Sequence, residues 1–320
     1  MSRAAGRLCI CLTPLHVLIA RRIAGGERRR FSTGLFVTSA DNDKQRHYAQ
    51  RMREFCDAVE YRVLPGEHSY RGPKLPAVWL RRLKYRWLLR RAGRFSAVYA
   101  PSSNNHYVYI LLAALHFDEL VSYDDGLLNI NPDSPLFRAP TRWRARVFLR
   151  LAGVDYWPER IRERAARHYS IYDAQNICSR VVRLGLLEGA AGQGQGGGTV
   201  DRILLGPAPE AGAAVFDALR RAALRFSVGR YLPHPRETRP VLDGLECVQT
   251  PLVAEDYVLG RLEADPGLRF EIYGYDSAAL VNLAAVPRVR AFSLLQQAAP
   301  SRGAPPLGGL MRSCGVELIA

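Results

Sequence analysis

The sequence lacks any apolar run of about 18 residues, the length that a membrane-spanning helix needs. Its first residues, Met-Ser-Arg-Ala-Ala-Gly-Arg, lead into a short strand-like segment and not into the apolar core of a signal peptide. Cysteine is also scarce: there are six, and none stands at the spacing of metal ligands. We therefore expect a cytoplasmic protein with reduced thiols, no transmembrane helix and no metal site.

Acidic residues are few relative to basic ones. The 320 residues include 30 Asp and Glu against 45 Lys and Arg, a formal net charge of +15. Such a charge implies an acidic partner, which can be a nucleic acid, an anionic membrane or a phosphorylated substrate. The basic residues are spread over several segments, and no nucleic-acid-binding motif is present. A nucleic-acid-binding protein is therefore the alternative class, and we expect no nucleic-acid partner.

A glycine-rich stretch, residues 189–198, divides the chain. It lacks the Lys-Ser/Thr of a phosphate-binding P-loop and precedes a strand instead of following one, so its composition indicates a linker. On both sides of it, short apolar runs alternate with segments of helical periodicity. The sequence thus predicts two doubly wound, Rossmann-like α/β domains, residues 1–188 and 200–320, joined by the linker 189–199.

A helical segment of the first domain, residues 78–94, combines aromatic and apolar side chains with many basic ones. It is either a solvated helix with one apolar face or a helix that lies on an anionic lipid surface. Residues 138–152 are predicted to form another basic helix, and residues 161–168 continue in a similar style.

Chemistry-bearing residues follow several predicted strands. The strand at 119–123 ends in Asp124-Asp125-Gly126, which is either a turn or a site. The strand at 203–205 leads to Gly206 and Glu210, and the strand at 226–232 leads to Pro233-His234-Pro235-Arg236. Ligands of parallel α/β sheets bind outside the carboxyl ends of the strands, so we expect Glu210, His234 and Arg236 to share one crevice.

These residue types suit glycosyl transfer from a nucleotide sugar. That reaction needs a base for the acceptor hydroxyl, and Glu210, Asp124 or Asp125 can supply it. It needs a donor at the leaving phosphate, which His234 can be. At predicted helix starts, Ser277 offers its hydroxyl and backbone amides to a phosphate, and Glu255 offers a carboxylate to ribose hydroxyls. Each also has a purely structural interpretation. His-Pro is a common dipeptide, Ser277 can be a helix cap alone, and Glu255 can be a favourable charge in the first turn of a helix.

In order and spacing, the whole set resembles glycosyltransferase family 52, the bacterial lipooligosaccharide sialyltransferases. The segments that carry the resemblance are Cys11-Leu12-Thr13-Pro14-Leu15, Tyr123-Asp124-Asp125-Gly126 with Asn129, Val200 to Gly206, Pro233-His234-Pro235-Arg236, Ala254-Glu255-Asp256-Tyr257, and Glu271-Ile272-Tyr273 with Ser277-Ala278-Ala279-Leu280.

The resemblance implies a GT-B fold, with two Rossmann-like domains facing a central cleft. It implies inverting transfer of sialic acid from CMP-sialic acid to a terminal galactose of a surface glycolipid, with no metal and no cofactor. Carried over by position, His234 is the general acid at the phosphate, Glu255 holds the ribose, and Ser277 with Ala278 binds the phosphate. Gly206, Pro233, Pro235 and Arg236 complete the donor site.

The base is the point at which this sequence departs from the family. The family's proposed base is an Asp just after a Gly-x-Pro turn, whereas Pro209-Glu210 stands there in this chain. Glu210, Asp124 and Asp125 therefore remain candidates.

The resemblance also bears on partners. We expect a peripheral protein on the anionic inner face of the bacterial inner membrane, contacting it through the basic helices, and a homodimer. The alternative activity is transfer from another sugar nucleotide, either a different CMP-nonulosonate or a UDP-hexose.

Overall fold

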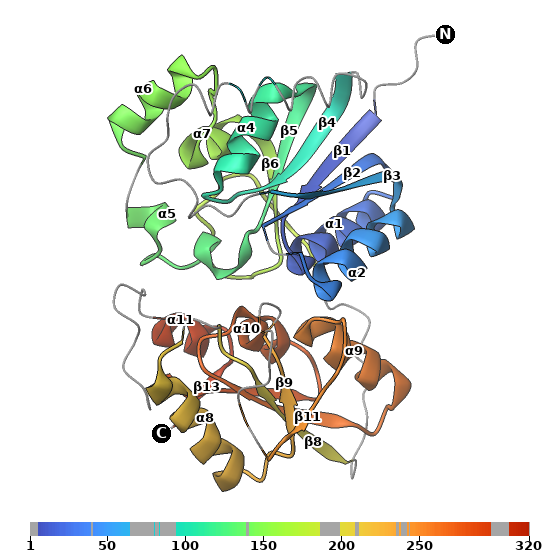
Figure 1. The fold of residues 1–320 in the computed structure, drawn as a ribbon, viewed down its shortest axis with the longest axis vertical. Helices are drawn as coiled ribbons and strands as arrows, with labels where there is room; N and C mark the ends of the chain where they lie inside the picture. Colours follow the sequence, from blue (N-terminus) through green and yellow to red (C-terminus); the bar gives the residue numbers. More distant parts are fainter. Residues whose placement is uncertain are drawn as a thin grey trace. The chain divides into compact units, whose positions relative to one another are not determined.

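The computed structural model describes residues 6–39, 41–64, 80, 83, 94–138, 141–185, 199–208, 211–234, 237, 242, 244–295 and 307–319. The chain separates into two compact units, Met1–Leu186 and Leu187–Ala320. Each unit is built on one parallel β-sheet with helices on both faces (Figure 1), which confirms the prediction of two doubly wound α/β units. The expected linker lies outside the described residues except for Thr199.

The sheet of the first unit has seven strands in the order β3-β2-β1-β4-β5-β6-β7, and every neighbouring pair is parallel. Its strands are β1 (Gly6–Cys11), β2 (Phe31–Thr38), β3 (Cys56–Val63), β4 (Arg94–Pro101), β5 (His116–Tyr123), β6 (Ala165–Ser170) and β7 (Val181–Arg183). Its helices are α1 (Pro14–Gly26), α2 (Asp43–Arg51), α4 (His106–Ala114), α5 (Pro135–Arg138), α6 (Trp143–Leu151) and α7 (Pro158–Arg164), with short 3₁₀ turns at Met52–Glu54 and Gly126–Asn129.

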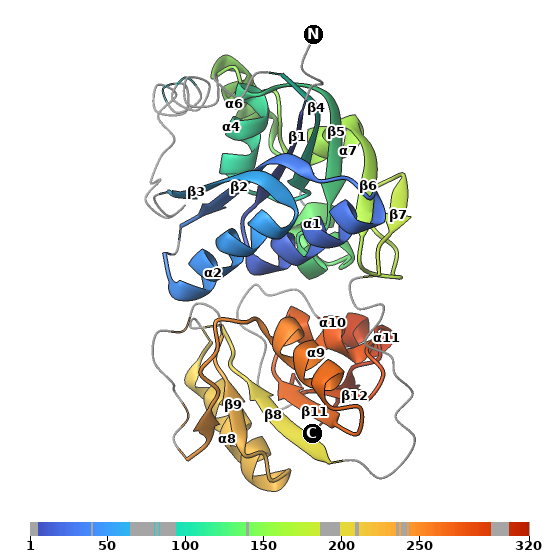
Figure 2. The same ribbon diagram turned by 90° about the vertical axis from the view of Figure 1, so that its right-hand side faces the viewer.

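Helix α1 shows how the sequence sets these boundaries. Thr13 is its N-cap and accepts a hydrogen bond from the backbone N–H of His16, while Pro14 occupies the first helical position, where a missing N–H costs nothing. Figure 2 shows α1 and α2 together on one face of the first sheet, and α4, α6 and α7 on the other. The carboxyl ends of the strands are thereby left to loops and helix starts.

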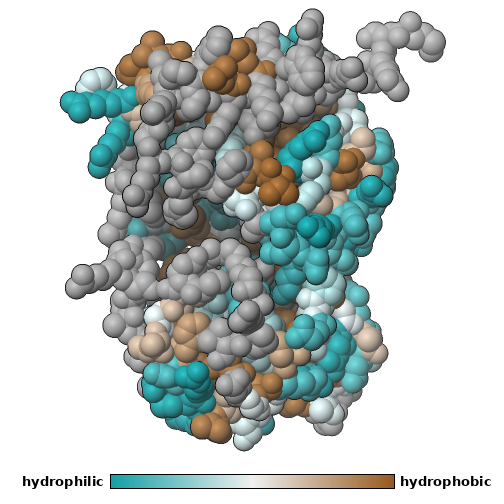
Figure 3. Space-filling model, viewed as in Figure 1, coloured by the Kyte–Doolittle hydropathy of each residue, from teal (hydrophilic) through white to brown (hydrophobic). Residues whose placement is uncertain are grey.

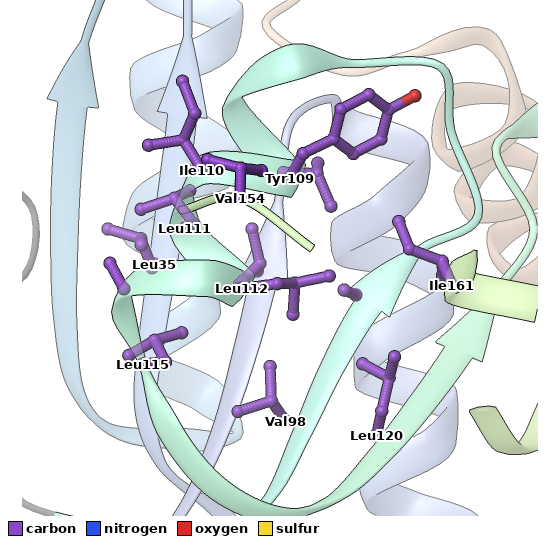
Figure 4. Close-up of a cluster of buried hydrophobic side chains, with 14 of the residues drawn as sticks. Leu35, Val98, Tyr109, Ile110, Leu111, Leu112, Leu115, Leu120, Val154 and Ile161 are labelled. Atoms are coloured by element: carbon purple, nitrogen blue, oxygen red, sulfur yellow. The ribbon is translucent and has the colours of Figure 1, made fainter. Parts of the chain in front are cut away.

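The core under α4 is drawn in Figure 4. Side chains of α4 such as Leu111 and Leu112 are almost fully buried in one cluster with strand residues such as Leu35 and Val98. These side chains are large and aliphatic, so their burial is the main stabilising contribution on this face, at roughly 1.5–3 kcal/mol for each fully buried side chain.

The second unit has a six-stranded parallel sheet in the order β10-β9-β8-β11-β12-β13. Its strands are β8 (Val200–Leu205), β9 (Arg230–Leu232), β10 (Glu246–Cys247), β11 (Arg269–Gly274), β12 (Val289–Ser293) and β13 (Glu317–Leu318), and its helices are α8 (Ala213–Arg225), α9 (Ala254–Ala264), α10 (Ala278–Ala284) and α11 (Gly308–Ser313). Tyr273 lies stacked between Phe226 and Phe292, with ring centroids 5.0 and 4.9 Å apart, in the core beside α8.

Several sequence-based boundaries were wrong. The basic helical segment expected to continue to residue 168 ends at Arg164. The residues that follow form β6, because their backbone pairs with both β5 and β7. The strand expected from residue 226 starts only at Arg230, since α8 runs to Arg225 and Ser227 has a positive φ of 51°. β13 lies beyond residues 289–292, the last strand that the sequence predicts.

The basic helix expected at 78–94 falls outside the described residues apart from Leu80, Leu83 and Arg94, and Arg94 begins β4. Among the described residues, none of the helices combines the length and the apolarity that crossing a bilayer requires.

Candidate functional site

In the first unit, polar side chains gather at the carboxyl ends of β1 and β5, on either side of β4. The strand order reverses between β1 and β4, and such a switch point is where open α/β sheets bind ligands. Asp124 and Asp125 follow β5, while His16 belongs to the first turn of α1, just after β1. The sequence-based prediction named the two aspartates and missed the histidine.

Asp124 is completely buried, and both of its carboxylate oxygens are engaged. Oδ1 accepts hydrogen bonds from His168 Nε2 at 2.9 Å and from Asn176 Nδ2 at 2.8 Å. Oδ2 accepts one from the backbone N–H of Ile171 at 2.9 Å. A carboxylate in this setting ties β5 to β6 and to the loop after β6.

His168, on β6, is the charge partner of Asp124 and is itself fully buried. Burial alone would lower the pKa of His168, but its interactions with Asp124 and Cys178 outweigh burial and raise the pKa to about 9. Its other ring nitrogen, Nδ1, lies 2.8 Å from Ser122 Oγ. The protonated imidazolium and the Asp124 carboxylate thus form a buried ion pair.

Asp125 lies in a different environment. Its side chain is 23% exposed, and Oδ1 lies 2.7 Å from His16 Nε2. His16 Nδ1 accepts the backbone N–H of Leu12 at 3.1 Å, so in the neutral ring the proton sits on Nε2 and is donated to Asp125. Within the part of the chain that the structure describes, no hydrogen bond reaches Asp125 Oδ2. One oxygen is therefore fixed and the other is available.

The turn that presents Asp125 depends on Gly126 and Asn129. Gly126 has a φ of +75°, a conformation that glycine adopts without the strain other residues meet. The fully buried Asn129 accepts the backbone N–H of Asp125 at 2.7 Å and donates to the carbonyl of Ser102 at 3.2 Å. These contacts hold the backbone that carries Asp125 in one conformation.

In the second unit, the carboxyl ends of β8 and β9 are in direct contact. The backbone N–H of Gly206 donates to the carbonyl of Leu232 at 2.8 Å. A Cβ added to Gly206 would lie 2.7 Å from the backbone nitrogen of His234 and 2.6 Å from Tyr231 Oη, closer than real Cβ atoms approach other atoms. Only glycine therefore fits beside the His-Pro turn.

Glu237 closes this turn. Its Oε2 accepts the backbone N–H of His234 at 3.1 Å and the hydroxyl of Tyr231 at 2.8 Å, and its own N–H donates to the carbonyl of His234 at 2.8 Å. Burial and the adjacent Glu237 carboxylate raise the pKa of the Tyr231 hydroxyl, which keeps it neutral and a donor. Pro233 and His234 are half-buried at this end of the sheet.

Two further predicted residues stand at helix starts of the second unit and are linked by a third. Glu255, in the first turn of α9, is only 6% exposed and accepts a hydrogen bond from Asn282 Nδ2 at 2.8 Å. Burial raises the pKa of Glu255, and the bond from Asn282 opposes that rise. Asn282 lies on α10, whose N-cap is Ser277, followed by Ala278; Ser277 Oγ accepts the N–H of Ala279 at 3.2 Å.

Three predicted site residues, Glu210, Pro235 and Arg236, lie outside the described residues. Three residues that the prediction missed, His16, Glu237 and Asn282, support predicted ones through hydrogen bonds. Glu237 alone had a nearby signal, an acidic residue three positions after His234.

The second unit thus offers an imidazole, a carboxylate and a helix-capping hydroxyl around the ends of its parallel strands, and the first unit offers a fixed carboxylate. Such groups can bind an anionic ligand and move a proton.

Comparison with known proteins identifies the family. The model of glycosyltransferase family 52 matches residues 33–296. A CMP-N-acetylneuraminate:beta-galactoside alpha-2,3-sialyltransferase of Pasteurella multocida is 27% identical over 278 residues, which are 86% of this chain and 86% of that protein. An N-acetyllactosaminide alpha-2,3-sialyltransferase of Haemophilus influenzae is 26% identical over 284 residues, 88% of this chain and 90% of that protein.

Among solved structures, the calicheamicin glycosyltransferase CalG4 is similar with a TM-score of 0.48 and 13% identity, over 93% of this chain and 81% of that one. The two parallel α/β units agree with the GT-B class expected from the sequence. Because the family model spans most of the chain and includes the Asp-Asp-Gly and His-Pro segments, the chain belongs to glycosyltransferase family 52.

Proposed function

We propose that this protein is an inverting sialyltransferase, which moves sialic acid from CMP-sialic acid to a terminal galactose of lipooligosaccharide or a related bacterial surface glycan. Family membership and the sialyltransferase relatives, one of which acts on a beta-galactoside, support this donor and a galactose-terminated acceptor. The observation that carries the proposal is the His-Pro turn, which Gly206 and Glu237 hold at the carboxyl end of a parallel sheet.

In this proposal the second unit binds the donor. His234 hydrogen-bonds the leaving phosphate and acts as the general acid, while Pro233, Pro235 and Arg236 complete that segment. Gly206 allows the backbone of the turn to pass close by. Glu255 holds the ribose hydroxyls, oriented by Asn282, and Ser277 with Ala278 contacts the phosphate.

The chemical step is a single displacement. The acceptor hydroxyl oxygen attacks the anomeric carbon of sialic acid and its proton passes to a carboxylate base. The bond from that carbon to the phosphate oxygen breaks, and His234 donates a proton to this oxygen as CMP leaves, which offsets the charge that develops on the phosphate. Stabilising that charge and removing that proton are the two tasks the protein performs.

We propose Asp125 as the base. Its carboxylate has one oxygen fixed by His16 and is partly exposed, as a group that must reach a substrate hydroxyl has to be. Asp124 fits the role less well, because its oxygens are buried and already accept three hydrogen bonds. Glu210 remains the alternative, because it stands in the sequence where the family's proposed base is found.

Binding of CMP, measured by calorimetry in the presence of EDTA, tests the donor site. We expect wild type to bind CMP and His234→Ala to bind it clearly more weakly, with no need of a metal. If wild type binds no CMP but is stabilised by a uridine nucleotide in a thermal-shift panel, the donor is another sugar nucleotide and the sialyl-transfer proposal is wrong.

For the cellular setting we propose a cytoplasmic, peripheral protein on the inner face of the inner membrane, where a lipid-linked acceptor is available. The homodimer implied by the family resemblance is tested by analytical ultracentrifugation of the full chain.

A further inference from the structure

Helix α6 of the first unit carries an apolar stripe that faces solvent. Trp143, Val147 and Leu151 stand four residues apart, and their exposed fractions are 69, 45 and 69%. Residues at i, i+4 and i+8 lie on one face of a helix. Figure 3 shows hydrophobic and hydrophilic residues side by side on the surface where Figure 1 draws α6.

Packing of the helix does not explain this stripe. The core contact of α6 is made by Leu149, which is 6% exposed, with Phe148 packed beside it. Because successive residues of a helix are rotated by about 100°, Leu149 lies on roughly the opposite face of α6 from Val147. The inward face is therefore complete without the three exposed side chains, whose exposure costs free energy unless something covers them.

Arginines border the stripe on both sides. Viewed down the helix axis, Arg144 lies next to Leu151 at one edge of the stripe, and Arg150 lies next to Trp143 at the other edge. The guanidinium of Arg144 lies 5.5 Å from the centre of the Trp143 ring, and Arg150 lies near Asp155 at 3.4 Å. α6 contains no acidic residue, and within the described ranges neither Arg142 nor Arg144 has an acidic partner.

We propose that the α6 stripe, Trp143, Val147 and Leu151, is a docking surface for an anionic lipid bilayer. A tryptophan and aliphatic side chains insert at the headgroup level, while the bordering arginines meet lipid phosphates. The net charge of +15 favours the same partner. This inference rests on the proposed function, because binding to the bilayer would hold the enzyme where its lipid-linked acceptor lies.

Vesicle co-sedimentation of the full chain tests this surface. The vesicles contain phosphatidylethanolamine with phosphatidylglycerol, and neutral phosphatidylcholine vesicles are the comparison. We expect W143S/L151S to lower the partition constant by about tenfold or more, because two large apolar side chains no longer enter the lipid. Arg144→Glu, which reverses the charge of a bordering arginine, should weaken the preference for anionic vesicles.

The matched control is Leu224→Ser, which removes an 83% exposed leucine from α8 of the other unit and should leave binding unchanged. Equal vesicle binding by W143S/L151S and wild type, or no binding by wild type, overturns the proposal. Circular dichroism verifies that the variants fold.

Transfer to a soluble lactose-type acceptor, measured without vesicles, separates the two proposals. W143S/L151S should retain wild-type rates with this acceptor. If wild type itself transfers nothing, the proposed function fails, while the vesicle result still decides the role of α6.

Discussion

Substituting the two adjacent aspartates one at a time should give two different kinds of defect. Asp125→Asn keeps the size of the side chain and its contact with His16 but removes the basic carboxylate oxygen. Because a positioned general base contributes roughly 10²–10⁴-fold, kcat should fall by about that factor. CMP binding should stay near wild type, since the residue acts on the acceptor. Stability should change by less than about 1 kcal/mol at this partly exposed position.

Asp124→Asn should instead destabilise the first unit. The amide replaces one acceptor oxygen by a donor, so that one of the buried donors from His168, Asn176 and the Ile171 backbone loses its acceptor. Breaking a buried ion pair costs about 3–5 kcal/mol, and that loss of unfolding free energy is what we expect. Any remaining folded protein should still bind CMP.

The assays are urea unfolding for stability, calorimetry for CMP binding, and CMP release with a lactose-type acceptor for kcat. Near-full kcat in Asp125→Asn would refute the base assignment, and Glu210→Gln, assayed in parallel, would then identify the alternative. Unchanged stability in Asp124→Asn would refute the structural role given to that carboxylate.

Three further predictions follow from the contacts described. The pKa of His168 is raised from 6.5 to about 9, so its contribution to stability is complete below pH 6.5 and is lost as the pH rises through 9. Urea unfolding should show a fall of up to about 3 kcal/mol over that range, and a flatter profile in His168→Gln. Gly206→Ala should lower stability by about 1–3 kcal/mol in thermal unfolding and weaken CMP binding, whereas Gly229→Ala, whose new Cβ meets nothing within 4 Å, should do neither. Asn282→Ala should weaken CMP binding about tenfold in calorimetry, through the loss of one hydrogen bond that orients Glu255; equal affinity would mean that Glu255 does not contact the nucleotide.

Much of the fold could be predicted because parallel strands buried on both faces appear as short apolar runs between helical segments. The prediction failed at β6, Ala-Ala-Arg-His-Tyr-Ser, which contains an arginine and a histidine. His168 is buried there only because Asp124, 44 residues earlier, neutralises it. That pairing is a tertiary contact, and local sequence does not contain it.

The candidate site was predictable to the same extent. The Asp-Asp-Gly and His-Pro segments are short motifs with distinctive chemistry, so they can be found locally. His16 fits the apolar periodicity of α1 as an ordinary helical residue, and its partner Asp125 is 109 residues away. Asn282 contacts Glu255 across 27 residues and carries no motif of its own.

The way in which the His-Pro turn is anchored makes position 234 suitable for chemical rescue. Glu237 accepts a hydrogen bond from the backbone N–H of residue 234, and Gly206 packs against the same nitrogen. Neither contact depends on which side chain is present at position 234. Removing the imidazole should leave these backbone contacts intact, with an empty space of the size of the ring. Free imidazole added to His234→Ala can then enter that space and restore part of the turnover.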